Sequence, residues 1–148
     1  MYTDVITLFN RHKTADGDVW YPTVLKGVDL NIDKAAIIAK YGDQSADNAR
    51  LHVKYSLENG AVIISGKKYY SPKEWDRQAD EDLPGSLTFT GGNDFDFFIE
   101  GEWYEDAIND NDYLDGFYNY MNTRFDFVFA VTSVAKYSVI PHFEIMAK

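Results

Sequence analysis

Two glutamates stand beside two aromatic residues in the second half of the chain, at Glu100, Glu102, Trp103 and Tyr104. Glycoside hydrolases act with a pair of carboxylates, and aromatic rings provide platforms for sugars. On a strand, however, residues i and i+2 always share one face and lie about 6–7 Å apart. We therefore interpret the pair as a solvent-exposed strand face, with a glycan-binding or glycan-cleaving module as the alternative.

A run of acidic and amide residues from Asn109 to Gly116 could supply oxygen ligands to calcium. An EF-hand loop needs ligands at positions 1, 3 and 5 and a glycine at position 6. Counted from Asp110, position 5 is Leu114 and the glycine stands at position 7. The spacing therefore fails, and helix capping explains most of these acids. A weak calcium-dependent adhesion site is kept as an alternative.

The chain contains few other residues that act as nucleophiles or metal ligands. Cysteine is absent from the 148 residues, which excludes a disulfide, a cysteine-ligated zinc site and a thiol nucleophile. The histidines, His12, His52 and His142, stand far apart in the sequence, without a second histidine at metal-ligand spacing. We expect no catalytic residue, no metal ion, no cofactor and no enzymatic activity.

Large aromatic side chains are the better candidates for contact with a partner. Tryptophan supplies contact area at a small cost in side-chain entropy and is enriched at the centres of protein interfaces. We therefore take Trp20, Trp75 and Trp103 as candidate interface residues.

The overall charge narrows the classes of partner. The formal net charge is −10. Residues 79–148 contain 14 acidic and 3 basic residues, whereas residues 1–78 contain 10 acidic and 11 basic residues. Lys and Arg provide the attraction to phosphates and to anionic lipids. We therefore expect neither sequence-specific nucleic-acid binding nor membrane binding, and we expect no signal peptide and no membrane span.

Alternation of apolar and polar residues predicts a mainly β, antiparallel protein, barrel-like or sandwich-like, with two short helices. We expect one domain over residues 1–148 with an acidic insert around residues 80–115. The expected strands are Val5–Arg11, Val19–Lys26, Gly27–Asp33, Leu51–Leu57, Val62–Ile64, Leu87–Thr90 and Asp94–Glu100. The last stretch, Phe125–Val134 and Val139–Met146, is either a central strand with its partner or one long bent strand.

Turn and capping residues predict where these elements begin and end. Tight hairpins are expected at Asp16-Gly17, at Asn59-Gly60 and at Gly91-Gly92, because these residues tolerate the backbone of primed turns. Ser71 with Pro72 and Glu74 predicts a helix near residues 72–78. A second helix is expected near residues 112–122, with Asp112 as its cap.

The segment Asp33–Asn48 is long for a connection inside a compact domain, and such loops are usually functional or mobile. Its first half is small and apolar, which suggests a surface that a partner covers. We predict an assembly-dependent loop with Ile37, Ile38 and Tyr41 as the candidate residues. The alternative is a short helix packed on its own barrel.

Several stretches together carry a resemblance to a known class of proteins. They are Thr3–Arg11, Val19–Val28, Tyr70–Trp75 (Tyr-Ser-Pro-Lys-Glu-Trp), Leu87–Phe89, Phe129–Val134 and Pro141–Ile145 (Pro-His-Phe-Glu-Ile). Their order resembles that of small structural proteins of tailed bacteriophages that infect Gram-positive hosts, in particular head–tail connector proteins of the head-closure, or stopper, type.

This resemblance implies a small β-barrel that forms a ring, hexameric or matched to a dodecamer, between the portal with its adaptor and the tail. It implies a structural role in the virion neck, retention of packaged DNA, and synthesis in the cytoplasm of the host bacterium. The expected partners are the adaptor or portal, the tail terminator and further copies of the same chain. The alternative is a role at a neighbouring position of the particle, as a tail terminator or another tail component.

Overall fold

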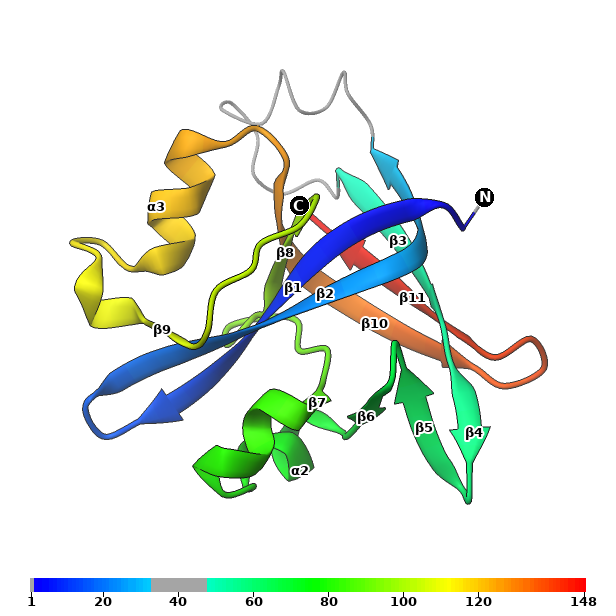
Figure 1. The fold of residues 1–148 in the computed structure, drawn as a ribbon. Coiled ribbons are helices and arrows are strands. Elements are labelled where there is room, and N and C mark those ends of the chain that lie inside the picture. The colour runs from blue at the N-terminus through cyan, green and yellow to red at the C-terminus, as the bar shows by residue number, and fades with distance from the viewer. Residues whose placement is uncertain (1, 33–47) are drawn as a thin grey trace.

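Six antiparallel strands in the computed structural model, which describes residues 2–32 and 48–148, pair in a closed circuit (Figure 1). The strand order is β1–β8–β10–β11–β3–β2, and β2 pairs again with β1. Because each strand has two partners, the circuit is a small barrel. Its strands are β1 (Asp4–Thr14), β2 (Gly17–Ile32), β3 (Ala49–Lys54), β8 (Phe97–Glu100), β10 (Val128–Tyr137) and β11 (His142–Ala147).

The long strand β2 closes the barrel because it changes partner along its length. Up to Val28 it pairs with β1, and from Asp29 it pairs with β3. The register with β1 skips Gly27, which has a φ of +67°. A bulge of this kind bends a strand, and glycine adopts a positive φ without steric cost. Gly27 therefore marks the corner at which β2 turns from one side of the barrel to the other.

The barrel interior is filled by alternate side chains of these strands. Ile6 and Leu8 of β1 are fully buried there, together with Phe98 of β8 and Phe143 and Ile145 of β11. Period-2 alternation sends every second side chain inward. The sequence pattern that predicted strands therefore also defines this core.

A four-stranded sheet with short helical turns adjoins one end of the barrel (Figure 1). Its strands are β4 (Ser56–Glu58), β5 (Ala61–Ile64), β6 (Lys67–Tyr69) and β7 (Ser86–Leu87), and the helical turns are α2 (Pro72–Asp76) and η1 (Asp80–Gly85). Trp75 of α2 packs edge-on against Tyr21 and His12, and His12 Nδ1 lies 2.7 Å from Asp76 Oδ1. These contacts join α2 to β1 and β2.

A second hydrophobic core lies outside the barrel, beneath helix α3 (Phe117–Arg124). Phe9, Trp20 and Phe97 point outward from β1, β2 and β8 and pack against Phe117 and Met121 of α3. The short elements β9 (Ile108–Asn109) and η2 (Asp110–Asp112) complete this layer. One wall of the barrel is therefore apolar on both faces.

The predicted fold class, mainly β and antiparallel with short helices, is confirmed. The Asn59-Gly60 hairpin is also confirmed: both residues have a positive φ, 51° and 82°, and Glu58 pairs with Ala61 across the turn. The Asp16-Gly17 hairpin and the helix near residues 72–78 are present too. The C-terminal stretch forms two strands, β10 and β11, rather than one bent strand.

The predicted hairpin at Gly91-Gly92 is wrong. Strand β7 pairs with β6, and β8 pairs with β1 and β10, so β7 and β8 are not partners in a hairpin. The two runs touch only at Thr90 and Asp96, where Asp96 N donates to Thr90 O at 2.7 Å. Gly91 instead lies against the backbone of β10, where a Cβ atom would stand 2.7 Å from Thr132 O. This glycine is needed for a close approach between chain segments and not for a turn.

The other corrections concern element boundaries. The second helix begins at Phe117 and not near Asp112, because Gly116 has a φ of +88°. Strand β11 begins at His142, so Val139 and Ile140 belong to the turn before it. Residues 80–115, the expected acidic insert, include β8 of the barrel wall.

A buried carboxylate, Asp96, joins the segments that meet at the start of β8. Its Oδ1 accepts a hydrogen bond from the backbone N–H of Arg11 (2.8 Å), and its Oδ2 accepts from Thr90 N (2.8 Å) and Asn10 Nδ2 (2.9 Å). Its own carbonyl accepts from Val131 N at 2.9 Å. Burial raises the pKa of Asp96 to about 7, although these hydrogen bonds act in the opposite direction.

We expect Asp96→Asn to destabilise the protein, because an amide –NH₂ would face a buried N–H donor in place of a carboxylate oxygen. The expected loss at neutral pH is about 1–3 kcal/mol, the cost of an unsatisfied buried polar group. Chemical denaturation of the variant and of the unaltered protein would measure it. The exposed Asp94, whose pKa is held low by a hydrogen bond from Lys13, provides the control variant Asp94→Asn.

The same pair of proteins gives a pH test. Because the folded-state pKa of Asp96 is about 7, above its ordinary value, its contribution to stability is complete at acidic pH and is lost as the pH rises through about 7. The stability difference between the unaltered protein and Asp96→Asn should therefore shrink by up to about 1.4 kcal/mol per pH unit between about pH 5 and pH 7. A difference that grows with pH would contradict this assignment.

Candidate functional site

Two of the three predicted interface tryptophans are buried, and that prediction is wrong for them. Trp20 and Trp75 are each 1% exposed. Trp20 belongs to the second core and donates from Nε1 to Asp110 Oδ1 at 2.9 Å, while Trp75 is enclosed between α2 and β2. A side chain covered by its own chain cannot anchor a partner, so both tryptophans are structural.

The acidic loop predicted as a possible calcium site is organised by hydrogen bonds. Asp110 Oδ1 also accepts from Phe117 N at 2.8 Å and so caps the start of α3. Asn111 Nδ2 donates to Asp16 O. Within residues 2–32 and 48–148, no group of three or more His, Cys, Asp or Glu side chains is placed to hold a metal ion. The capping interpretation therefore holds, with Asp110 and not Asp112 as the cap.

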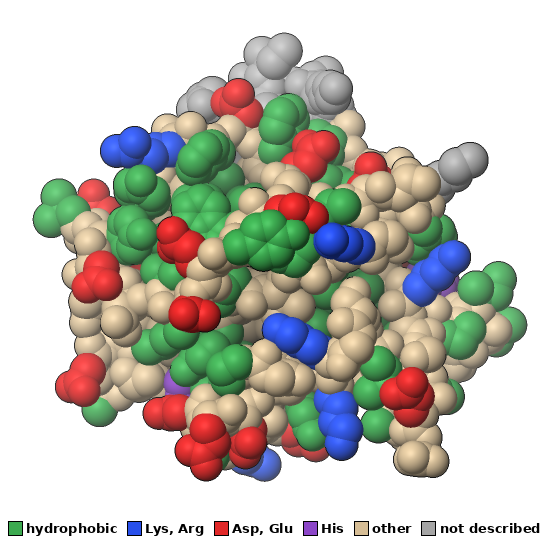
Figure 2. All heavy atoms as spheres, in the orientation of Figure 1, with side chains coloured by type: hydrophobic (Ala, Val, Ile, Leu, Met, Phe, Trp, Pro, Cys, Tyr) green, Lys and Arg blue, Asp and Glu red, His purple; other side chains and the backbone are tan. Residues whose placement is uncertain are grey.

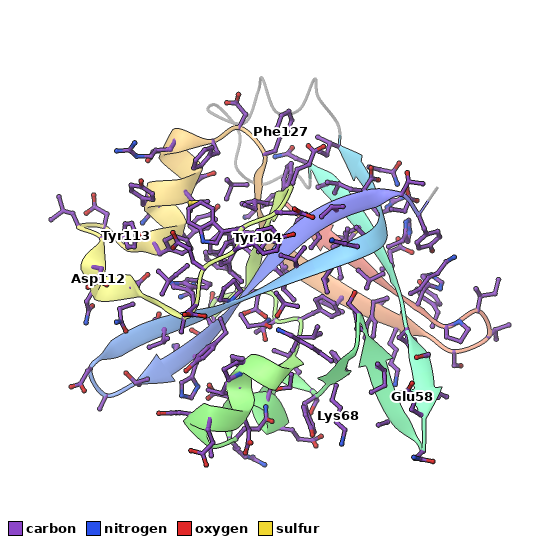
Figure 3. All side chains as sticks on the ribbon, viewed as in Figure 1. Glu58, Lys68, Tyr104, Asp112, Tyr113 and Phe127 are labelled. Atoms are coloured by element: carbon purple, nitrogen blue, oxygen red, sulfur yellow. The ribbon has the colours of Figure 1, made fainter. Side chains whose placement is uncertain are left out.

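Trp103, the third candidate, lines a groove of about 430 Å³ between α3 and β8, which we call the α3 groove. Its walls combine apolar and charged side chains from the end of β8, the end of α3 and the start of β10. They are Ile99 and Glu100 of β8, Glu102 and Trp103 just after it, Met121 and Arg124 of α3, and Phe125, Asp126 and Phe127, which precede β10. Figure 3 shows Tyr104 and Phe127 on this side of the molecule, and Figure 2 shows hydrophobic and acidic side chains gathered there.

The position of Trp103 depends on the hydroxyl of Thr7 in β1. Thr7 Oγ1 donates to Gly101 O at 2.9 Å and accepts from Trp103 N at 2.9 Å, which fixes the chain just after β8. The indole then packs edge-on against Phe9 and Phe117. The groove floor is therefore part of the second core and is rigidly held.

Glu102 does not have the electrostatics of a general acid. A hydrogen bond from Tyr104 and the nearby Lys26 hold the pKa of Glu102 below its ordinary value. A general acid in glycoside hydrolysis needs a raised pKa. Glu102 therefore presents negative charge beside the aromatic rings of the groove.

Exposed apolar side chains gather at a second place, the turn between β10 and β11. Val139 is 96% exposed and Ile140 is 73% exposed, and Tyr137 before them is 46% exposed. Tyr55 supports this turn, since its N–H donates to Pro141 O at 3.3 Å and its hydroxyl to Tyr137 O at 2.9 Å. We call Tyr137–Ile140 the hairpin tip.

The sequence does not indicate the hairpin tip, because the apolar residues Val139 and Ile140 fit the start of the predicted strand Val139–Met146. Pro141 was the available signal, since proline lacks the N–H that a central strand needs. The predicted strand Phe125–Val134 likewise includes Phe125 and Phe127. In the structure both precede β10 and are 49% and 36% exposed. The candidates Ile37, Ile38 and Tyr41 lie outside the described residues.

We expect Asp110→Ala to destabilise the protein by about 1–2 kcal/mol, because it removes the cap of α3 and leaves the Trp20 N–H without its acceptor. Asp112→Ala is the matched control, since that side chain is exposed and does not cap α3. Thermal unfolding followed by tryptophan fluorescence would compare them, and equal stability of the two variants would contradict the capping role.

No helix in the described part of the chain has the length and apolar character to cross a bilayer. A search of curated proteins finds no match, and a search of solved structures finds none either. One family model matches over residues 1–148, and its description is a family of unknown function, DUF6751. Because the match covers the whole chain, the protein belongs to the DUF6751 family.

Proposed function

We propose that the protein is a structural component of a tailed-bacteriophage neck, of the head-closure type, that forms a ring joining the portal and adaptor to the tail. The resemblance in motif order is the starting point. Its stretches form the barrel itself: Thr3–Arg11 lies largely in β1, Val19–Val28 in β2 and Phe129–Val134 in β10. The motif around Pro72 and Trp75 forms α2, which packs on β1 and β2.

The observation that carries the proposal is a rigid barrel with exposed apolar side chains at two separate places. A closed barrel has no strand edges to offer, so contacts with neighbours must come from side chains. Val139, Ile140 and Phe125 are all largely exposed, and clustered exposed apolar residues mark protein contacts. A subunit within an assembly needs such surfaces.

The charge distribution also suits this role. Acidic residues crowd the second half of the chain, and Figure 2 shows acidic side chains spread over the face that carries α3. Negative charge repels DNA phosphates, so DNA can pass a ring of such subunits without adhering to it. A position further along the neck, such as the tail terminator, would use the same properties.

Deletion of the gene from a phage or prophage that encodes this chain would test the proposal. We expect DNA to be packaged into heads that then lose it or fail to join tails, with free tails accumulating. Restoring the gene in trans should restore tailed particles, and the chain should be present in purified virions by mass spectrometry. Infectious, tailed particles from the deletion strain would contradict the proposal.

The second candidate is a glycan-binding module, favoured by Trp103 beside Glu100 and Glu102 in the α3 groove. Tyr104 is 71% exposed next to them and could act as a sugar platform. A glycan array would test this function with Trp103→Ala and Tyr104→Ala. Binding by the unaltered chain that both changes abolish would support the module, and an array without binding would remove it.

A further inference from the structure

We infer that copies of this chain associate head to tail, with the hairpin tip of one copy seated in the α3 groove of the next. This inference deepens the proposed ring and rests on it for biological context, although the contact itself is a property of the chain. It assigns the two exposed apolar surfaces to each other and names a second copy of the chain as the occupant of the groove.

The first argument is shape and polarity. The groove is an open depression with aromatic and thioether side chains from Trp103, Met121 and Phe125, and the tip is a narrow projection that carries Val139 and Ile140. A projecting aliphatic pair entering an aromatic pocket buries apolar surface on both partners. Within the described residues, Phe125 of the groove is 49% exposed, and Val139 and Ile140 of the tip are 96% and 73% exposed.

The second argument is charge. The groove is lined by Glu100, Glu102 and Asp126 and by Arg124, whose guanidinium lies over the Tyr120 ring. Lys26 Nζ lies 3.4 Å from Glu102 Oε1, so the acidic side chains exceed the cations by one. The chain from Phe127 to Phe143, which includes the tip, contains Lys136 and no acidic residue. The hairpin tip itself is uncharged, but Lys136 stands directly before it, so a cation accompanies the tip toward a groove with an excess of acidic side chains. Such complementarity fixes orientation and rejects wrong pairings.

The third argument is the placement of the two surfaces. Helix α3 and the tip of the β10–β11 hairpin lie on opposite sides of the barrel, as Figure 1 shows. Two different complementary patches on opposite sides make a heterologous contact, which repeats from copy to copy and forms a ring when the rotation closes. A self-complementary patch would instead stop at a dimer.

Cysteine cross-linking tests this contact directly, because the chain contains no native cysteine. A double variant, Ile140→Cys with Phe125→Cys, would be oxidised at about 1 mM protein, a concentration that populates even a weak contact. Both positions are exposed, so folding should persist, and circular dichroism would check it. We expect a ladder of dimers, trimers and larger species on a non-reducing gel.

Two controls make the ladder specific. Mixing the two single-cysteine variants should give dimers and nothing larger, because each chain then has one reactive end. A double variant with Leu114→Cys in place of Phe125→Cys should give no ladder, although Leu114 is 100% exposed and more open to random collision. Phe127→Cys offers a second position in the groove if Phe125→Cys misfolds.

A charge exchange tests the electrostatic part. In the double-cysteine background, Lys136→Glu should strongly reduce every cross-linked species, because each link is the same contact, and adding Asp126→Lys should restore them. Monomers alone, or an equal ladder from the Leu114 control, would overturn the head-to-tail contact. A ladder together with normal tailed particles from the gene deletion would support the contact and contradict the neck function. A neck defect without a ladder would support the neck function and contradict the contact.

Discussion

The closure of the barrel depends on one buried carboxylate. Asp96 accepts hydrogen bonds from Asn10, Arg11 and Thr90, and its backbone carbonyl accepts from Val131. The ionised carboxylate accepts on both oxygens, whereas asparagine has one acceptor oxygen and an –NH₂ donor, so an Asp96→Asn variant could not satisfy all of these donors. Because β8 begins immediately after Asp96, this cluster sets where β8 lies between β1 and β10.

The register of β8 then divides the side chains between two cores. Phe98 faces the barrel interior, while Phe97 and Ile99 face outward toward α3. Because this wall is apolar on both faces, its outer face must be shielded from water, and α3 packs over it. Hydrogen bonds from Trp20 and Phe117 to Asp110 hold α3 in this position. The α3 groove exists at the edge of this cover, where Phe125 and Phe127 leave the helix without complete burial.

The sequence predicted the features that local chemistry determines. The Asn59-Gly60 turn, the strands beside it and the Pro72 helix start each depend on a few consecutive residues, and all are present. The features it mispredicted depend on distant segments. Gly91 is fixed by contact with Thr132 in β10, and the start of α3 by a carboxylate seven residues earlier.

The candidate site divides in the same way. Glu100, Glu102 and Trp103 were recognisable as a group because they are neighbours in sequence, but their meeting with Phe125 and Phe127 requires the fold. The burial of Trp20 and Trp75 could not be predicted, because alternation places a side chain on a face of a sheet without showing whether a helix covers that face. Whether a helix packs over a given face of the sheet depends on the tertiary structure.

The closed strand circuit has a consequence for behaviour at high concentration. The remaining edge strands in the described residues, β4, β7 and β9, contain only two or three residues each. Short edges are poor templates for the strand addition that leads to amyloid-like aggregates. A chain with so little free strand edge is expected to reach high concentrations with little tendency to grow fibrils.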